Sequence, residues 1–134
     1  VSPASGIVPS SDEQPQFNHV VEALDSLGIA YIHIVEGATG GPRDARPFDF
    51  GALRQRFRNT YIANNGYDLE LAKSRLAGGK ADLFAFGHDF IANPDLVERL
   101  KSGAPLAQMN PATTYGGGAA GYTDYPTAIV TTDA

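Results

Sequence analysis

The sequence predicts an α/β fold in which short parallel strands alternate with helices. Three apolar runs, at residues 30–36, 60–64 and 81–86, are rich in the β-branched and aromatic residues that favour strands. Helical patterns separate these runs, and strands that alternate with helices at this spacing form right-handed parallel β-α units. Such units are typical of an open doubly wound sheet or of a (β/α)8 barrel. A closed barrel needs about 250 residues, so this chain could form only an arc of one.

The first half of the chain supplies the first two predicted strands and the helices before them. Residues 1–12 are expected to be a loop, and residues 14–28 a helix that ends at Gly28. Five apolar residues recur in this helix at helical spacing: Phe17, Val20, Val21, Leu24 and Leu27. After the first strand comes a long glycine-rich loop, and residues 48–57 form a short amphipathic helix.

The second half continues the alternation and ends in a segment without periodicity. A helix is predicted at residues 68–79, with an aspartate as its N-cap and glycines at its end. After the third strand, residues 88–92 form a short helix, and a longer one follows at 93–103 with Asn93 as its cap. Residues 104–134 are rich in glycine, tyrosine and threonine and are expected to form an irregular capping tail.

Composition excludes several classes of partner. The net charge of −5 and the pI near 5.0 argue against nucleic acid or an anionic membrane as a ligand, since both require basic patches. No apolar stretch approaches the length of a membrane span, and no secretory signal is recognisable. The chain has no cysteine, so it has no disulfide and no thiolate metal site. A cytoplasmic location is the expectation.

Ligands of both candidate architectures bind at the carboxyl ends of the strands. The second predicted strand runs into Asn65–Gly66 and the third into Gly87–His88. If these strands are neighbours, backbone N–H groups of the two turns converge beside the start of the 88–92 helix, which suits an anion such as phosphate. The alternative is an ordinary turn in which glycine only satisfies a φ angle. Both interpretations stay open on the residues alone.

Other polar residues are weaker candidates. Arg43 and Arg46 could clamp a carboxylate or phosphate, but a solvated loop surface is the more common role of such charges. His19 is expected to face solvent from its helix, and His33 to be a hydrogen-bonded core histidine in the first strand. No cluster of histidines and carboxylates suggests a metal site. Tyr115 lies in a tyrosine- and glycine-rich stretch, 113–126, of a kind that can line a pocket with hydroxyl donors.

Four segments together resemble the C-terminal part of the Old Yellow Enzyme family: YIHIVEGATGGPRD, YIANNGYDLELA, ADLFAFGHDFIANPDLVERLKSGAPL and NPATTYGGGAAGYTDYP. Members of that family are FMN-dependent ene-reductases on a (β/α)8 TIM barrel. The resemblance implies that residues 1–134 run from the end of strand 5 through strand 8 and the C-terminal tail of a single FMN-binding barrel domain. Another chain or segment would complete it.

The resemblance also implies roles for individual residues. Asn65 and Gly66, with Gly87 and His88, would bind the FMN phosphate, and Tyr115 would lie near the flavin edge and the substrate pocket. NADPH or NADH would donate hydride to FMN, which passes it to an activated alkene. No catalytic residue is expected in this chain, because the family's substrate-binding His/Asn pair and proton-donor tyrosine belong to the missing half.

One departure from the family pattern concerns the phosphate turn. The family's eighth-strand motif reads Gly-Arg, whereas this chain has Gly87–His88. A histidine offers fewer donors than an arginine and a pH-dependent charge, so weaker phosphate binding is expected. The arginine that precedes the Ser-Pro of strand 5 in the family has no counterpart before the initial VSP.

An incomplete barrel exposes the inward face of its strands and two unpaired edges. We therefore expect the apolar runs at 31–35 and 83–86 to face water in the isolated chain. The first hypothesis is one piece of a split, nicked or circularly permuted ene-reductase, active with a complementary N-terminal barrel chain. The alternative is a non-catalytic half-barrel that associates with itself and binds flavin or phosphate. A third possibility, a flavodoxin-like phosphate binder, would need a phosphate loop after its first strand, and the sequence shows none.

Overall fold

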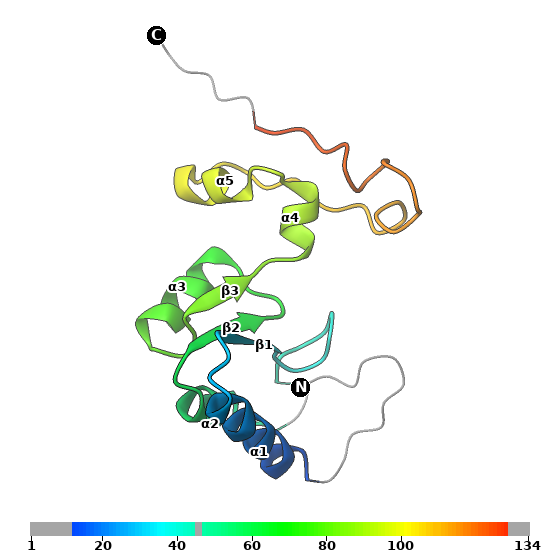
Figure 1. The fold of residues 1–134 in the computed structure, drawn as a ribbon. Helices are drawn as coiled ribbons and strands as arrows, with labels where there is room; N and C mark the ends of the chain where they lie inside the picture. The colour runs from blue at the N-terminus through cyan, green and yellow to red at the C-terminus, as the bar shows by residue number, and fades with distance from the viewer. Residues whose placement is uncertain (1–11, 45–46, 129–134) are drawn as a thin grey trace. The chain divides into compact units, whose positions relative to one another are not determined.

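The computed structural model describes residues 12–44 and 47–128, which form the predicted alternation of helices and strands (Figure 1). The elements are α1 (Glu13–Ser26), β1 (Tyr31–Val35), α2 (Phe50–Arg56), β2 (Thr60–Asn64), α3 (Leu69–Ala77), β3 (Leu83–Ala85), α4 (His88–Ala92) and α5 (Leu96–Ser102). By internal packing the chain divides into two compact units, residues 1–85 and residues 86–134. The helical pattern at 14–28 and the short helix at 88–92 are confirmed.

The first unit contains a three-stranded parallel sheet in the order β1-β2-β3. Tyr31 pairs with Thr60 and Val35 with Asn64, while Asn64 also pairs with Ala85. The carboxyl ends of all three strands therefore lie at one edge of the sheet, as the sequence predicted for neighbouring strands.

Only one face of this sheet is covered within the described residues. On that face Ile32, Tyr61 and Ala63 are at most 6% exposed, and they pack with Leu53 of α2 in the core. Because side chains alternate along a strand, the other face presents Tyr31 and Leu83, which are 57% and 54% exposed. The expectation that the apolar runs at 31–35 and 83–86 face water is confirmed in part: Tyr31 and Leu83 are exposed, whereas Ile32 is buried and residues 84–86 are half-buried. Parallel sheets normally bury both faces, so the uncovered face is an unsatisfied surface.

His33 is a correction to the sequence analysis. It lies on the uncovered face of β1, the same face as the exposed Tyr31, and is itself exposed rather than buried in the core. The reason is the pleat: Ile32 and Ile34 turn toward the helices, which leaves the odd-numbered residues of β1 on the opposite side. His19, by contrast, is exposed on α1 as expected.

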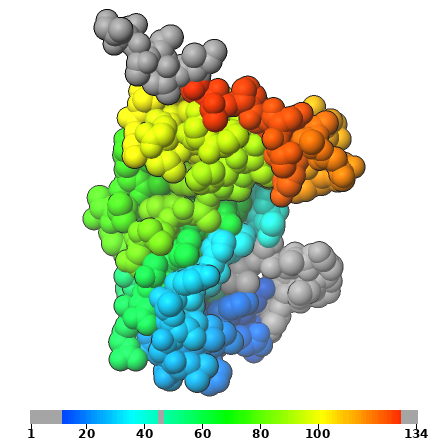
Figure 2. Space-filling view, turned by 45° about the horizontal axis from the view of Figure 1, so that its top comes forward, coloured from blue at the N-terminus to red at the C-terminus, as the bar shows by residue number. Residues whose placement is uncertain are grey.

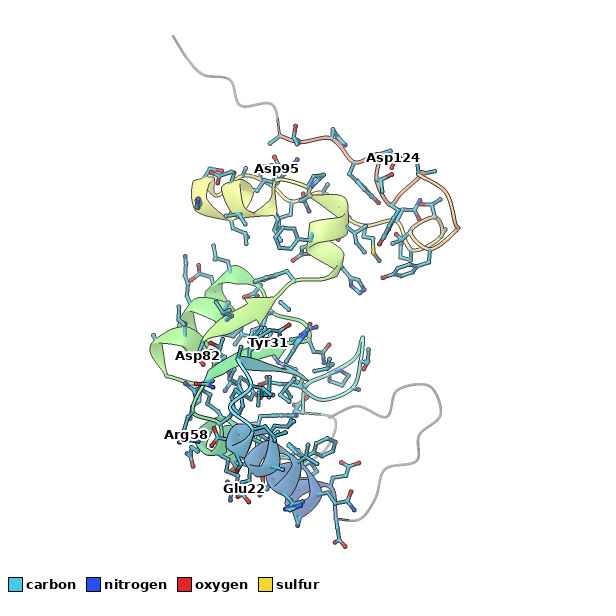
Figure 3. The ribbon with its side chains drawn as sticks, in the orientation of Figure 1. Glu22, Tyr31, Arg58, Asp82, Asp95 and Asp124 are labelled. Carbon is cyan, nitrogen blue, oxygen red and sulfur yellow. The ribbon has the colours of Figure 1, made fainter. Side chains whose placement is uncertain are left out.

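Helices α1 and α2 lie side by side (Figure 1), joined by side chains at both ends of α2. Gln14 of α1 accepts a hydrogen bond from the backbone N–H of Asp49, the N-cap of α2, at 2.7 Å. Glu22 on α1 (labelled in Figure 3) pairs with Arg56 at 2.9 Å. Arg58, also labelled, donates its backbone N–H to Asp25 at 2.8 Å and pairs with it through the guanidinium at 2.8 Å, and these contacts hold the pKa of the Asp25 carboxyl below its usual value. Exposed ion pairs of this kind each contribute little, so they orient the helices more than they stabilise them.

The second unit consists of α4, α5 and the irregular segment that follows. The predicted cap of the last helix is wrong: the helix begins at Leu96 with Asp95 as its N-cap. Asn93 instead donates to the carbonyl of Asp89 and to that of Ala107, and accepts from the Ala107 N–H. The side chain of Asn93, fully buried, thus joins the end of α4 to the tail and is not free to cap α5.

The described part of the tail, residues 104–128, has turns but no helix or strand, as predicted. It is fastened to α5 by a pair of charged residues. Arg99 bonds to Asp95 at 2.7 Å and donates to the carbonyls of Pro105 and Pro126. Asp95 (labelled in Figure 3) also accepts from the Ala128 N–H, and these contacts hold the pKa of its carboxyl below the ordinary value. The tail is therefore attached to α5 near both ends of its described part, at Pro105 and at Pro126 and Ala128.

Candidate functional site

The turn after β2 is built around the side chain of Asn65. Its backbone has a φ of 104°, the only positive φ of a non-glycine residue in the described part of the chain. Its buried amide donates to the carbonyls of Glu36 at 2.6 Å, Ala38 at 2.9 Å and Gly41 at 3.1 Å. Because Asn is one of the few residues that tolerates this region, the unusual φ and the hydrogen bonds explain each other. Asn65 ties the loop after β1 to the end of β2.

Gly66 and Gly87, the two glycines predicted to bind phosphate, differ in backbone conformation, but both have free space where a side chain would be. Gly66 has a φ of 62°, which favours glycine regardless of any ligand. Gly87 has an ordinary φ of −81°. A Cβ built on either glycine meets no atom within 4 Å. Glycine at position 87 is therefore required neither by a backbone angle nor by a close neighbour in the chain, which leaves room for a ligand to approach the backbone.

His88 and Tyr115 lie in the second unit, and both are exposed. His88 is the first residue of α4, which begins where the sequence predicted. Tyr115 is 76% exposed, and its ring lies 6.3 Å from that of Tyr122. Asn65 and Gly66 belong to the first unit, where their turn leaves the strand paired with β3.

A buried polar network that the sequence analysis missed lies beside the Asn65 turn. Glu36, 8% exposed, accepts a hydrogen bond from the Tyr67 hydroxyl at 2.6 Å and one from the Tyr61 hydroxyl at 3.3 Å. Burial, together with the Glu36 carboxylate, raises the pKa of Tyr67 to about 12 and raises that of Tyr61 further. Both phenols therefore stay protonated at neutral pH and can donate to the carboxylate. The available signal was a glutamate directly after an apolar strand, with tyrosines in and after the next strand.

The side chain of Arg43 also differs from the expectation that it is solvated. Its guanidinium carbon lies 4.6 Å from the centre of the Tyr67 ring, a cation–π arrangement. Its Nη1 is buried and has no hydrogen-bond partner. Arg46, the other loop arginine considered, lies outside the described residues.

Neither a metal centre nor a membrane span is found in the described part of the chain. Residues 12–44 and 47–128 contain no group of three or more histidines and carboxylates placed to hold a metal ion. No helix of these segments combines the length and the apolar character that crossing a bilayer requires.

The parallel sheet of consecutive β-α units defines the class as α/β, and comparison with known proteins places the chain in a family. Residues 6–107 match the NADH:flavin oxidoreductase / NADH oxidase family, and the chain belongs to that family. The resemblance to the Old Yellow Enzyme family is confirmed.

Similar proteins cover nearly all of this chain. It is 36% identical to 12-oxophytodienoate reductase 2 of Arabidopsis thaliana over 94% of this chain and 35% of that protein. It is 36% identical to a protein of Leishmania infantum named as a probable flavin mononucleotide-dependent alkene reductase, over 94% and 34%. The structure of morphinone reductase in complex with tetrahydroNAD matches with a TM-score of 0.81 and 38% identity, over 94% of this chain and 33% of that one. The chain spans about a third of the length of these relatives.

Proposed function

We propose that this chain forms the carboxyl-terminal part of the (β/α)8 barrel of an FMN-dependent ene-reductase. The reaction is the reduction of an activated C=C bond, as in an enone, enal or nitroalkene, with NADPH or NADH. The observation that carries the proposal is the family match over residues 6–107. Relatives in this family use FMN and NAD(P)H. The similar protein named as an alkene reductase supports the substrate class.

The residues present fit the phosphate end of FMN. Gly66 and Gly87 offer exposed backbone with no atom of the chain above it, so an anion can approach their N–H groups closely. The side chain of Asn65 is already used by three carbonyls, so only its backbone N–H is available for a ligand. We assign phosphate binding to the backbones of Asn65, Gly66, Gly87 and His88.

His88 adds a side-chain donor to this set. Its imidazole is exposed and can turn toward a phosphate, but it lacks the fixed fork of an arginine. Tyr115 has an exposed hydroxyl that suits it to the substrate pocket. When bound, FMN supplies the hydride-transfer chemistry, and the role of this chain is to bind and orient it. The catalytic residues are proposed to lie in the rest of the barrel.

The uncovered face of the sheet supports the need for that remaining part. Tyr31, His33 and Leu83 are exposed on it, and burying an apolar side chain of this size is worth roughly 1.5–3 kcal/mol. The edges of β1 and β3 have no further strand among the described residues. We propose that the other barrel strands, carried by a complementary chain or segment, cover this face. A second copy of this chain could cover the same surface without forming an ene-reductase.

Native mass spectrometry of the purified particle, followed by an activity assay, tests the proposal. The expected particle contains this polypeptide, the remaining barrel strands and one FMN, and it oxidises NADPH only when an enone such as 2-cyclohexenone is added. A homodimer near twice 14.2 kDa that binds FMN but does not consume the enone would favour the non-catalytic half-barrel. A particle that binds no flavin would refute the ene-reductase, and one that binds neither flavin nor phosphate would refute both.

A further inference from the structure

A cavity on the helix-covered side of the sheet is lined by none of the residues assigned to FMN. Its volume is about 890 Å³, within the range of small-molecule sites. Its lining comes from residues 42–44 and 47–51 of the loop before α2 and its first turn, from Arg75 and Lys80 in and after α3, and from Glu36 and Tyr67. Tyr67 packs on Phe84 at 4.7 Å, and Phe84 pairs with the fully buried Ala63. We call this space the lateral cavity. In Figure 2 the part of the loop before residue 45, drawn in cyan, lies at the visible surface.

The carboxylates that line the lateral cavity are mostly committed to other partners. Glu36 accepts the hydroxyls of Tyr61 and Tyr67, and Asp49 accepts the Ala52 N–H as the cap of α2. Asp44 is the remaining acidic residue in the lining.

The cations of the lining, in contrast, are not committed. Arg43 has its buried Nη1 without a partner, and neither Arg75 nor Lys80 forms an ion pair with any described residue. Arg43 and Arg75 line the same cavity, and the Arg43 guanidinium lies over the Tyr67 ring. An unpaired buried guanidinium N–H is costly unless an acceptor reaches it. The cavity therefore has three cations available against one carboxylate.

The same cavity provides apolar contact area next to these charges. Phe48 and Phe50 line it with their rings 4.8 Å apart, and the Tyr67 ring is beneath Arg43. A ligand that used both features would carry an anionic oxygen group on a flat apolar body. Arginine suits such a group because its planar fork binds carboxylate or phosphate through two parallel hydrogen bonds.

We propose that the lateral cavity binds a small organic anion, an aromatic carboxylate or phosphate, with its charged group between Arg43, Arg75 and Lys80. The body of the ligand packs against Phe48 and Phe50. This site is separate from the FMN turns and does not depend on the proposed ene-reductase activity.

Isothermal titration of the folded protein with phenyl phosphate, benzoate and inorganic phosphate tests the proposal. The two aromatic anions are expected to bind more tightly than inorganic phosphate, because only they contact the rings. Arg75→Gln combined with Lys80→Gln should weaken phenyl phosphate binding by about tenfold, since a charged hydrogen bond is lost. Both positions are exposed, so the two substitutions should not disturb the fold. Arg43 is left intact because it packs on Tyr67.

Two matched variants give the result specificity. Lys73→Gln removes one cation from an exposed position of α3 that pairs with Glu70 outside the cavity, and it should change the affinity by less than about twofold. His88→Ala should leave phenyl phosphate binding unchanged. An equal loss with Lys73→Gln, a loss with His88→Ala alone, no loss with the double variant, or no binding of the aromatic anions would each overturn the proposal.

Discussion

Replacing Asn65 tests the role of a single side chain in shaping the turn after β2. The amide has two N–H groups, which three carbonyls share at 2.6, 2.9 and 3.1 Å. Counting two hydrogen bonds at about 1 kcal/mol each, their loss costs about 2 kcal/mol. An alanine at a φ of 104° adds about 1 kcal/mol of backbone strain, which a glycine avoids. Asn65→Ala is therefore expected to cost about 3 kcal/mol and Asn65→Gly about 2.

Urea unfolding followed by far-UV circular dichroism measures both variants, with the slope compared to confirm that the unfolding transition is unchanged. Asn59→Ala is the matched control, because Asn59 is exposed and its amide donates one bond, to the carbonyl of Ile29 at 2.8 Å. It should cost about 0.5–1 kcal/mol. Equal stability of Asn65→Gly and the wild type would show that the amide does not hold the loop. Equal stability of the alanine and glycine variants would show that the backbone angle carries no strain.

Three further outcomes are expected. Leu53→Ala should destabilise the protein by about 3 kcal/mol, because Leu53 is fully buried, while Leu76→Ala at a 54%-exposed position should stay within about 1 kcal/mol in the same assay. The pKa of Tyr67 is raised, so its stabilising contribution is complete below pH 10.0, its ordinary value, and is lost as the pH rises toward about 12. Tyr67→Phe should thus be less stable than the wild type at pH 8, and pH-dependent melting should show the gap closing above pH 10.0; a constant gap would contradict this. His88→Arg should tighten FMN binding about three- to tenfold at pH 8, where an arginine is charged, as measured by flavin fluorescence; unchanged affinity would leave the backbone amides as the phosphate ligands.

Features set by local sequence could be predicted. The strands followed from runs of apolar residues, and the short α4 followed from its place after the glycine turn that ends the third strand. Asp68 accepts from the Leu71 N–H at 2.8 Å, as its position before α3 indicated. Gly28 and Gly103 end their helices with φ values of 67° and 71°. In each case the deciding interactions span only a few residues.

Features that join distant residues could not be predicted in the same way. Glu36 and Tyr67 are 31 positions apart, and Asn93 reaches Ala107 across 14. In both cases a polar residue that looks ordinary in the sequence becomes buried because folding brings a partner to it. His33 shows the converse, since an alternating strand gives no indication of which face will be covered.

In the candidate site, too, some features could be predicted from the sequence and others could not. The position of the turns at neighbouring strand ends followed from the order of elements, and β2 and β3 do end at the paired residues Asn64 and Ala85. That Gly87 has an ordinary φ could not be read from the sequence, because glycine is compatible with either sign. Because this φ is open to any residue, turn geometry does not explain the glycine, and the approach of a ligand is the remaining explanation.

The affinity of the folded protein for FMN with Gly87 replaced by valine tests the central claim most directly. No atom lies within 4 Å of a Cβ at this position, and valine in place of glycine at the N-cap of α4 should lower the stability without ligand by no more than about 1 kcal/mol. If the Gly87 backbone contacts the FMN phosphate, the added side chain should block that approach and weaken FMN binding by at least about tenfold, the loss of one charge-assisted hydrogen bond. Wild-type affinity in a stably folded Gly87→Val variant would contradict the assignment of this turn to the flavin phosphate.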